Sequence, residues 1–155
     1  MLTLRLRPAT DADTDWLTEL FLSTMQPAIT AARGAWDRQR EETQFRSQLR
    51  LADTRVIRLD QEEVGFITVA PISPSCTEVH TLCVKTDCQG VGIATSVLRE
   101  LMSAASDGGA LELSVLKTNG RAHALYERLG FEVTRTSTHH IRMRWVLRRS
   151  SENAR

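Results

Sequence analysis

A short glycine-containing stretch, Val84 to Thr95, holds the residue types and spacing that most suggest chemistry. Gly90 and Gly92 stand just before a helical pattern that begins at Ile93. The first backbone N–H groups of a helix have no partner within the helix and lie at its positive end, so they favour an anion. Because glycine has no Cβ, a phosphate can approach its backbone closely. The stretch therefore predicts either a phosphate site or a tight strand-to-helix connection.

Two common nucleotide-binding loops fit this stretch poorly. A P-loop requires Lys and then Ser or Thr after its last glycine, where this chain has Ile93 and Ala94. The dinucleotide fingerprint requires a third glycine at the place of Thr95, and its glycines directly follow the first strand of the fold. A nucleotide-binding domain is therefore the weaker alternative.

The pattern Gln89-x-x-Gly92-x-Ala94 resembles the pyrophosphate loop of the GNAT superfamily, the Gcn5-related N-acetyltransferases. A second segment, Asn119 to Phe131, is similar to that family's Asn-x-x-Ala-x-x-Leu-Tyr-x-x-x-Gly-Phe helix, and the two motifs stand in the family's order. The resemblance implies an α+β fold with a mixed, mostly antiparallel central sheet flanked by helices on both faces. It also implies acetyl-CoA as the cofactor and is closest to bacterial small-molecule or protein N-acetyltransferases.

The same resemblance assigns the cofactor-binding residues to three places: the strand before the loop, the loop itself and the later helix. The main chain of the strand pairs with the pantetheine arm of coenzyme A in the family, and the loop amides hold its phosphates. The corresponding residues are Leu82, Cys83, Val84, Gln89, Gly90, Val91, Gly92, Ile93, Ala94, Thr95, Asn119, Arg121, Ala122, Tyr126 and Arg128.

Acyl transfer to an amine requires a proton acceptor. An alkylammonium of pKa ~10.4 is only about 0.04% neutral at pH 7, equivalent to roughly 4.6 kcal/mol. Glu78 is the first candidate base, because some family members carry a catalytic glutamate at this place. Strand alternation puts His80 on the same face, so either residue could act, directly or through water. The alternative for Glu78 is an ordinary exposed strand residue.

Protonation of the departing thiolate requires an acid. Tyr126, the single tyrosine of the chain, resembles the family's tyrosine whose hydroxyl reaches the coenzyme A sulfur. A core aromatic residue is the alternative. A backbone N–H near Leu82 or Cys83 is expected to hold the oxyanion. Together these residues predict direct transfer, which an acyl-cysteine on Cys83 or Cys88 would contradict.

Candidate acceptor contacts come from the region of the first two helices and from the last hairpin, again by resemblance. The alternative role for the candidates from the helical region is packing in the core or in a lid. The alternative for the two histidines of the hairpin is that they are simply exposed to solvent. No third ligand stands near the histidine pair, so no metal is expected. The candidates are Met25, Trp36, Phe45, His139 and His140.

The hydrophobic pattern predicts the elements that must position these residues. Thr10 and Asp13 form a capping box before a first helix that Pro27 is expected to interrupt, and a sparse apolar stripe predicts a second helix from Trp36 to Leu51. Two more helices are expected over 92–105 and from Asn119 to Gly130. Strands are expected over 2–7, 55–59, 64–70, 77–84, 111–116, 131–136 and 141–147.

Length and composition limit the other classes. The 155 residues predict a single acetyltransferase domain over 1–149 and a disordered tail over 150–155. With 20 Lys and Arg against 19 Asp and Glu, the net charge of +1 favours neither nucleic acid nor a membrane surface as partner. No apolar run has membrane-spanning length and no secretory leader is evident, so a cytoplasmic protein is expected. The three cysteines suit neither a disulfide framework nor a zinc site.

The leading prediction is an acetyl-CoA-dependent N-acetyltransferase that acts on a small amine, a protein N-terminus or a lysine. The alternative is a non-catalytic acyl-CoA-binding sensor or regulatory module. Because a sensor has no use for a proton donor at the sulfur, Tyr126 together with Glu78 favours the enzyme. The expected partners are the cofactor and the acceptor amine, and a homodimer is left open.

Overall fold

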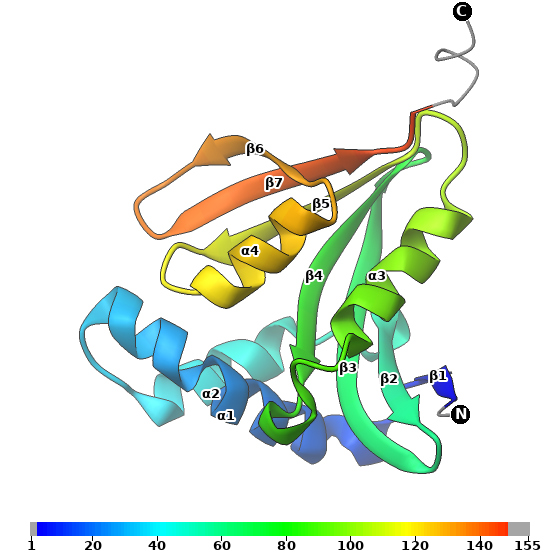
Figure 1. The fold of residues 1–155 in the computed structure, drawn as a ribbon. Coiled ribbons are helices and arrows are strands. Elements are labelled where there is room, and N and C mark those ends of the chain that lie inside the picture. Colours follow the sequence, from blue (N-terminus) through cyan, green and yellow to red (C-terminus); the bar gives the residue numbers. More distant parts are fainter. Residues whose placement is uncertain (1–2, 149–155) are drawn as a thin grey trace, which may run out of the picture. The chain divides into compact units, whose positions relative to one another are not determined.

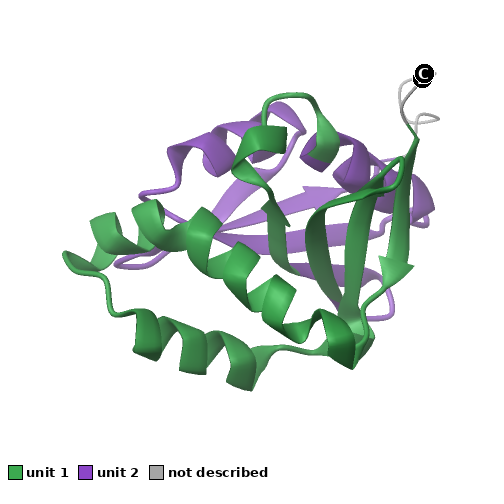
Figure 2. Ribbon diagram, turned by 90° about the horizontal axis from the view of Figure 1, so that it is seen from below, with its two compact units in different colours: residues 1–69, 80–93 green, residues 70–79, 94–155 purple. Residues whose placement is uncertain are grey.

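The computed structural model describes residues 3–148, and the chain divides into two compact units (Figures 1 and 2). Unit 1 comprises Met1–Val69 and His80–Ile93, and unit 2 comprises Ala70–Val79 and Ala94–Arg155. The start of the predicted first strand at Leu2 and the predicted tail over 150–155 lie outside the described residues. None of the helices in the described part is long and apolar enough to cross a membrane.

The described chain contains four α-helices and seven strands. The strand order is β1-β2-β3-β4-β5-β7-β6, with β4 and β5 parallel and the pairs β1–β2, β2–β3, β5–β7 and β6–β7 antiparallel. The predicted α+β class with a mixed, mostly antiparallel sheet is confirmed. The elements are β1 (Leu4–Pro8), α1 (Thr14–Arg33), α2 (Arg38–Gln48), β2 (Thr54–Leu59), β3 (Glu62–Ser73), β4 (Cys76–Val84), α3 (Ile93–Ala104), β5 (Ala110–Leu116), α4 (Gly120–Arg128), β6 (Glu132–Thr136) and β7 (His140–Val146).

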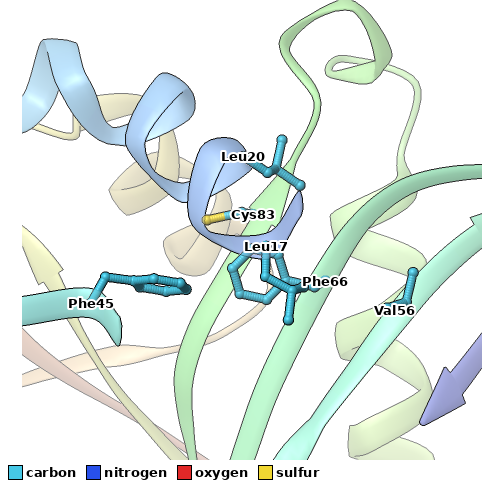
Figure 3. Packing of buried hydrophobic residues seen from close by; sticks show 6 residues of the cluster. All are labelled: Leu17, Leu20, Phe45, Val56, Phe66 and Cys83. Carbon is cyan, nitrogen blue, oxygen red and sulfur yellow. The ribbon is translucent and has the colours of Figure 1, made fainter. Parts of the chain in front are cut away.

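Unit 1 has a core built from α1, α2 and strands β2 to β4 (Figure 3). Phe45 is the apolar residue that anchors the otherwise polar α2. Its ring stacks on Phe21 with centroids 4.5 Å apart and meets Phe66 edge-on at 6.1 Å. Such aromatic pairs add to the stabilisation that comes from burying apolar surface. The buried cluster consists of Leu17, Leu20, Phe45, Val56, Phe66 and Cys83.

Helix α1 runs through Pro27, so the predicted interruption there is wrong. Proline lacks an N–H, which removes one helical hydrogen bond. Beyond the proline, however, the Ile29 side chain is buried at 7% exposure, so the last turns of α1 are stabilised by tertiary packing. The helix ends instead at Gly34, which has a φ of 79° and donates its N–H to the Thr30 carbonyl at 2.8 Å. Tertiary packing therefore outweighs the local cost of the proline.

Strand β3 also differs from its prediction, since it continues past Pro71 to Ser73. One of its residues, Gly65, is required by close strand packing. A Cβ at Gly65 would lie 2.3 Å from the Cys83 carbonyl oxygen, much closer than any real contact, so no other residue fits without displacing the main chain of β4. The hydrophobic pattern did not predict this close approach.

The sheet of unit 2 has two different faces. On one face, Val79, Leu113 and Met143 are mutual register partners on β4, β5 and β7, and all three are buried. On the other face, the next row consists of Glu78, Glu112 and Arg144. Because side chains alternate along strands, the same three strands present an apolar face and a charged face.

Candidate functional site

The predicted phosphate loop follows β4 in unit 1. After the 3₁₀ turn Thr86–Cys88, Gly90 and Gly92 have φ values of 84° and 89°, in the left-handed region that favours glycine. Nothing lies within 4 Å of a Cβ built at Gly92. The backbone conformation therefore requires the two glycines, and the space beside the second one is open.

Side chains and main chain fix the start of this loop. The Gln89 amide donates from Nε2 to the Val84 carbonyl at 2.9 Å, and the Lys85 N–H donates to the Val64 carbonyl on β3 at 2.8 Å. Residues 90–92 are exposed, with Val91 at 72%. The loop thus presents exposed backbone from a braced start, while Ile93 is buried and Ala94 and Thr95 are half-buried in the first turn of α3.

The cysteine thiols are poorly suited to nucleophilic chemistry. Burial raises the pKa of the Cys83 thiol to about 12, although a hydrogen bond with Thr24 opposes the shift. The pKa of Cys88 is raised by burial and by Asp87, and that of Cys76 by burial and by Glu112. Since the thiolate is the nucleophile, none of the three is activated.

Glu78 belongs to a charged cluster on the polar face of unit 2. Its Oε2 lies 2.7 Å from Nη2 of Arg142, and the same Nη2 lies 3.3 Å from Glu112 Oε1. Arg144 Nη1 donates to Glu112 Oε2 at 2.9 Å. Cys76 donates its S–H to that same oxygen at 3.1 Å. The structure therefore places the candidate base in a network of ion pairs.

The network acts on the charges of its members. The pKa of Glu112 is lowered, first by the hydrogen bond from Cys76 and then by the two arginines, against an opposing effect of burial. Burial is the largest influence on Arg142 and lowers its pKa, yet hydrogen bonds and charges of Glu78 and Glu112 together produce a net rise. Both groups are thus stabilised in their charged forms.

Helix α4 carries the second motif. Asn119 caps it by accepting from the Ala122 N–H at 3.3 Å, as predicted, and Gly130 follows its end with a φ of 98°. Tyr126 is buried at 8% exposure, and its ring lies edge-on to Phe131 with centroids 5.7 Å apart. Ala122 is half-buried, whereas Arg121 and Arg128 are exposed.

The other base candidate, His80, belongs to unit 1 and is exposed. Its Nδ1 lies 3.2 Å from the Thr81 hydroxyl. Next to it on β4, Leu82 is half-buried and Val84 is buried. His80 thus has less support from neighbouring side chains than Glu78 has.

The candidate acceptor residues occupy different environments. Phe45 lies in the core of unit 1, with Met25 packed half-buried against the same cluster, while Trp36 is half-buried. His139 and His140 are both exposed, His139 in the turn between β6 and β7 and His140 as the first residue of β7. Within residues 3–148, no group of three or more His, Cys, Asp or Glu could hold a metal ion.

Comparison with known proteins identifies the class of the chain. It belongs to the acetyltransferase (GNAT) family, whose model matches residues 16–131. Members of this family bind acetyl-CoA, as predicted from the sequence motifs. The exposed glycine loop, with open space at Gly92, fits the diphosphate of such a cofactor. No curated protein matches the sequence.

Several solved structures share the fold. An acetyltransferase from Thermus thermophilus has a TM-score of 0.72 and 22% identity, with 94% of this chain and 97% of that chain covered. The PaiA N-acetyltransferase from Thermoplasma acidophilum, solved in complex with coenzyme A, has a TM-score of 0.70 and 17% identity, with 94% and 99% covered. NAA60 from Arabidopsis thaliana, solved with a bisubstrate analogue, has a TM-score of 0.63 and 16% identity, with 94% and 99% covered.

Proposed function

We propose that this chain transfers an acetyl group from acetyl-CoA directly to a primary amine. The observation that carries the proposal is the loop between β4 and α3 in a member of the GNAT family, where Gly90 and Gly92 adopt positive φ and leave backbone exposed. The likeness to an N-acetyltransferase from Thermoplasma acidophilum supports nitrogen as the accepting atom. Small amines, protein N-termini and lysines are the acceptor classes to test.

The residues assigned to the cofactor would hold it through two kinds of group. The main-chain N–H groups at Gly90 to Ile93 would bind the phosphates, while the main chain of Leu82 to Val84 would pair with the pantetheine arm. The exposed Arg121 and Arg128 supply positive charge on α4. When bound, acetyl-CoA supplies the acyl group as an activated thioester.

The chain's own groups would move two protons. Glu78, or His80 in its place, would accept the proton that the acceptor ammonium must lose. Tyr126 would donate its Oη proton to the leaving group. A main-chain N–H near Leu82 or Cys83 would stabilise the oxyanion. The raised pKa values of the thiols, about 12 for Cys83, support direct transfer over an acyl-cysteine.

A matched pair of glycine variants tests the loop. Gly92→Ala and Gly34→Ala both place a Cβ at positive φ, 89° and 79°, with nothing within 4 Å in either case. Left-handed backbone costs each alanine about 1–2 kcal/mol, so both should melt earlier by a similar amount. Coenzyme A affinity, measured by calorimetry, should fall at least about tenfold for Gly92→Ala alone, equivalent to about 1.4 kcal/mol.

Turnover is measured as thiol release from acetyl-CoA with a panel of amines. The wild-type protein should release thiol with at least one member of the panel. Binding of coenzyme A without turnover on any amine would contradict an enzyme and favour the acyl-CoA-binding sensor. If the two glycine variants bound coenzyme A with equal affinity, the loop would not be part of the cofactor site.

A further inference from the structure

Two glutamates face each other on adjacent strands of unit 2. Glu78 and Glu112 are register partners in the parallel pair β4–β5. Like charges directly opposite each other destabilise a sheet, so this arrangement requires a cation. Two cations come from β7, where Arg144 is the register partner of Glu112 and Arg142 is the partner of Ser114 in the next row.

Arg142 must reach across a whole strand to meet Glu78. The distance from β7 to β4 corresponds to two strand spacings, roughly 10 Å. Its guanidinium nevertheless lies with Nη2 at 2.7 Å from Glu78 Oε2 and 3.3 Å from Glu112 Oε1, while Nη1 is 3.3 Å from the Ser114 hydroxyl. The planar guanidinium of arginine has several N–H donors in a fixed arrangement that suits three such partners. A lysine ammonium suits this arrangement poorly.

The two glutamates differ in the number of partners that their carboxylates have. Both oxygens of Glu112 are occupied, Oε1 by Arg142 and Oε2 by Arg144 and Cys76. Glu78 is paired through Oε2 with Arg142, its one side-chain partner within residues 3–148. The Glu78 side chain is 29% exposed. Glu78 is therefore the carboxylate of this pair that can accept a proton from a bound molecule.

We propose that Arg142 is a positioning residue for the transfer reaction, which fixes the Glu78 carboxylate through Oε2 so that Oε1 can accept the acceptor's proton. The inference rests on the proposed function and on Glu78 as its base. The proton passes from the acceptor ammonium to Glu78 Oε1, and Arg142 keeps its own protons throughout. Glu112 holds Arg142 from the other side, so the guanidinium remains fixed when Glu78 changes charge.

The charges around Glu78 set the expected pH dependence. Along β4, Cys76 precedes it and His80 follows it; β5 contributes Glu112, and β7 contributes Arg142 and Arg144. On β6, Glu132 and Arg135 are the register partners of the two arginines and balance each other. Without Arg142, the nearest charge opposite Glu78 is the carboxylate of Glu112, which disfavours a second ionised carboxylate. The active, ionised base would then form only at higher pH.

Three variants test this role, each measured as kcat, KM and the pH profile of kcat/KM on the best amine. Glu78→Gln should lower kcat by 10²–10⁴. Arg142→Met should lower kcat on the order of 10²-fold, with little change in the KM for acetyl-CoA, and should move the acid limb upward by about one pH unit or more. Arg144→Met, the control from the same strand, should cause a smaller loss without moving the acid limb.

A further variant covers the case in which Arg142→Met does not fold, which thermal melting will reveal. Arg142→Lys keeps the charge but loses the bridge to Glu78 and Glu112, so it should fold and still lower kcat. An unchanged or increased kcat with an unmoved acid limb in the Arg142 variants, while Glu78→Gln is impaired, would overturn the positioning role alone. Full activity of Glu78→Gln would overturn it as well. No turnover by the wild type would instead reject the proposed function.

Discussion

Each unit contains an arginine that bridges two carboxylates, but the carboxylates of the two clusters differ in how many partners they have. In unit 1, Arg7 donates from Nη1 and Nη2 to the two oxygens of Asp13 at 2.9 and 2.8 Å, and from Nη2 to Glu63 at 2.7 Å. Asp13 also accepts the Thr10 N–H at 2.8 Å as part of the capping box. In unit 2, Arg142 bridges Glu78 and Glu112, and it is the one residue of the described chain paired with the Glu78 side chain.

This difference separates a structural cluster from a candidate catalytic one. Every oxygen of Asp13 is used to join β1 to the start of α1, so protonation of Asp13 breaks contacts of the fold. Glu78 contacts Arg142 through Oε2, so protonation at Oε1 would leave this contact in place. Variants should therefore change stability in the first cluster and turnover in unit 2.

The largest effect expected outside the ion pairs of Glu78 tests the proposed acid, Tyr126 in unit 2. Tyr126→Phe removes one hydroxyl from a side chain that is 8% exposed and leaves the ring packed against Phe131. We expect kcat for thiol release to fall on the order of 10²-fold, a much larger change than that in coenzyme A affinity or in melting temperature. A large drop in melting temperature with normal kcat would place Tyr126 on the structural side of the comparison.

A smaller effect, on stability, is expected at Asp13. The hydrogen bonds from Arg7 are the largest cause that lowers the pKa of Asp13 from 3.8 to about 2. A lowered folded-state pKa contributes stability above the unfolded value, here about 2 kcal/mol, and this stability is lost as the pH falls from 4 towards 2. Asp13→Asn should lose it at pH 7 and show a flatter acid limb in urea unfolding. If Asp13→Asn impaired turnover without any loss of stability, the structural role of Asp13 would be contradicted.

The smallest effect is expected for an ion pair whose carboxylate is almost fully exposed. Arg46 on α2 lies 3.0 Å from Asp15 on α1, but that carboxylate is 90% exposed. Solvent screens such pairs, so Arg46→Gln should change the free energy of unfolding by at most about 0.5 kcal/mol. Urea unfolding beside Asp13→Asn gives the comparison directly. If Arg46→Gln lost as much free energy of unfolding as Asp13→Asn, burial would not explain the difference between the two ion pairs.

The sequence predicted well those features that depend on neighbouring residues. The capping box at Thr10 and Asp13, the cap at Asn119 and the stop at Gly130 were all found in place. Each is set by a few residues around a helix end, so local pattern is sufficient. The same holds for Gly90 and Gly92, whose positive φ values agree with the predicted glycine loop.

Features that depend on distant chain segments were missed. Pro27 lies within α1 because Ile29 is packed, which a helix-breaking rule cannot anticipate. Arg142 meets Glu78 only through the register of three strands, β4, β5 and β7, and one residue of slippage would turn it to the other face. The motif residues were therefore predictable, whereas Arg142, the residue paired with the candidate base, was not.

The absent side chain at Gly65 has a consequence for the strand beside it. Since a single added carbon would meet the Cys83 carbonyl at 2.3 Å, the course of the β4 backbone from which Leu82 to Val84 present their amides is set from β3. The shape of the strand that we propose to bind the cofactor thus depends partly on a glycine in the neighbouring strand. Substituting that residue would move a whole stretch of main chain at once, and no change among the strand's own side chains could restore it.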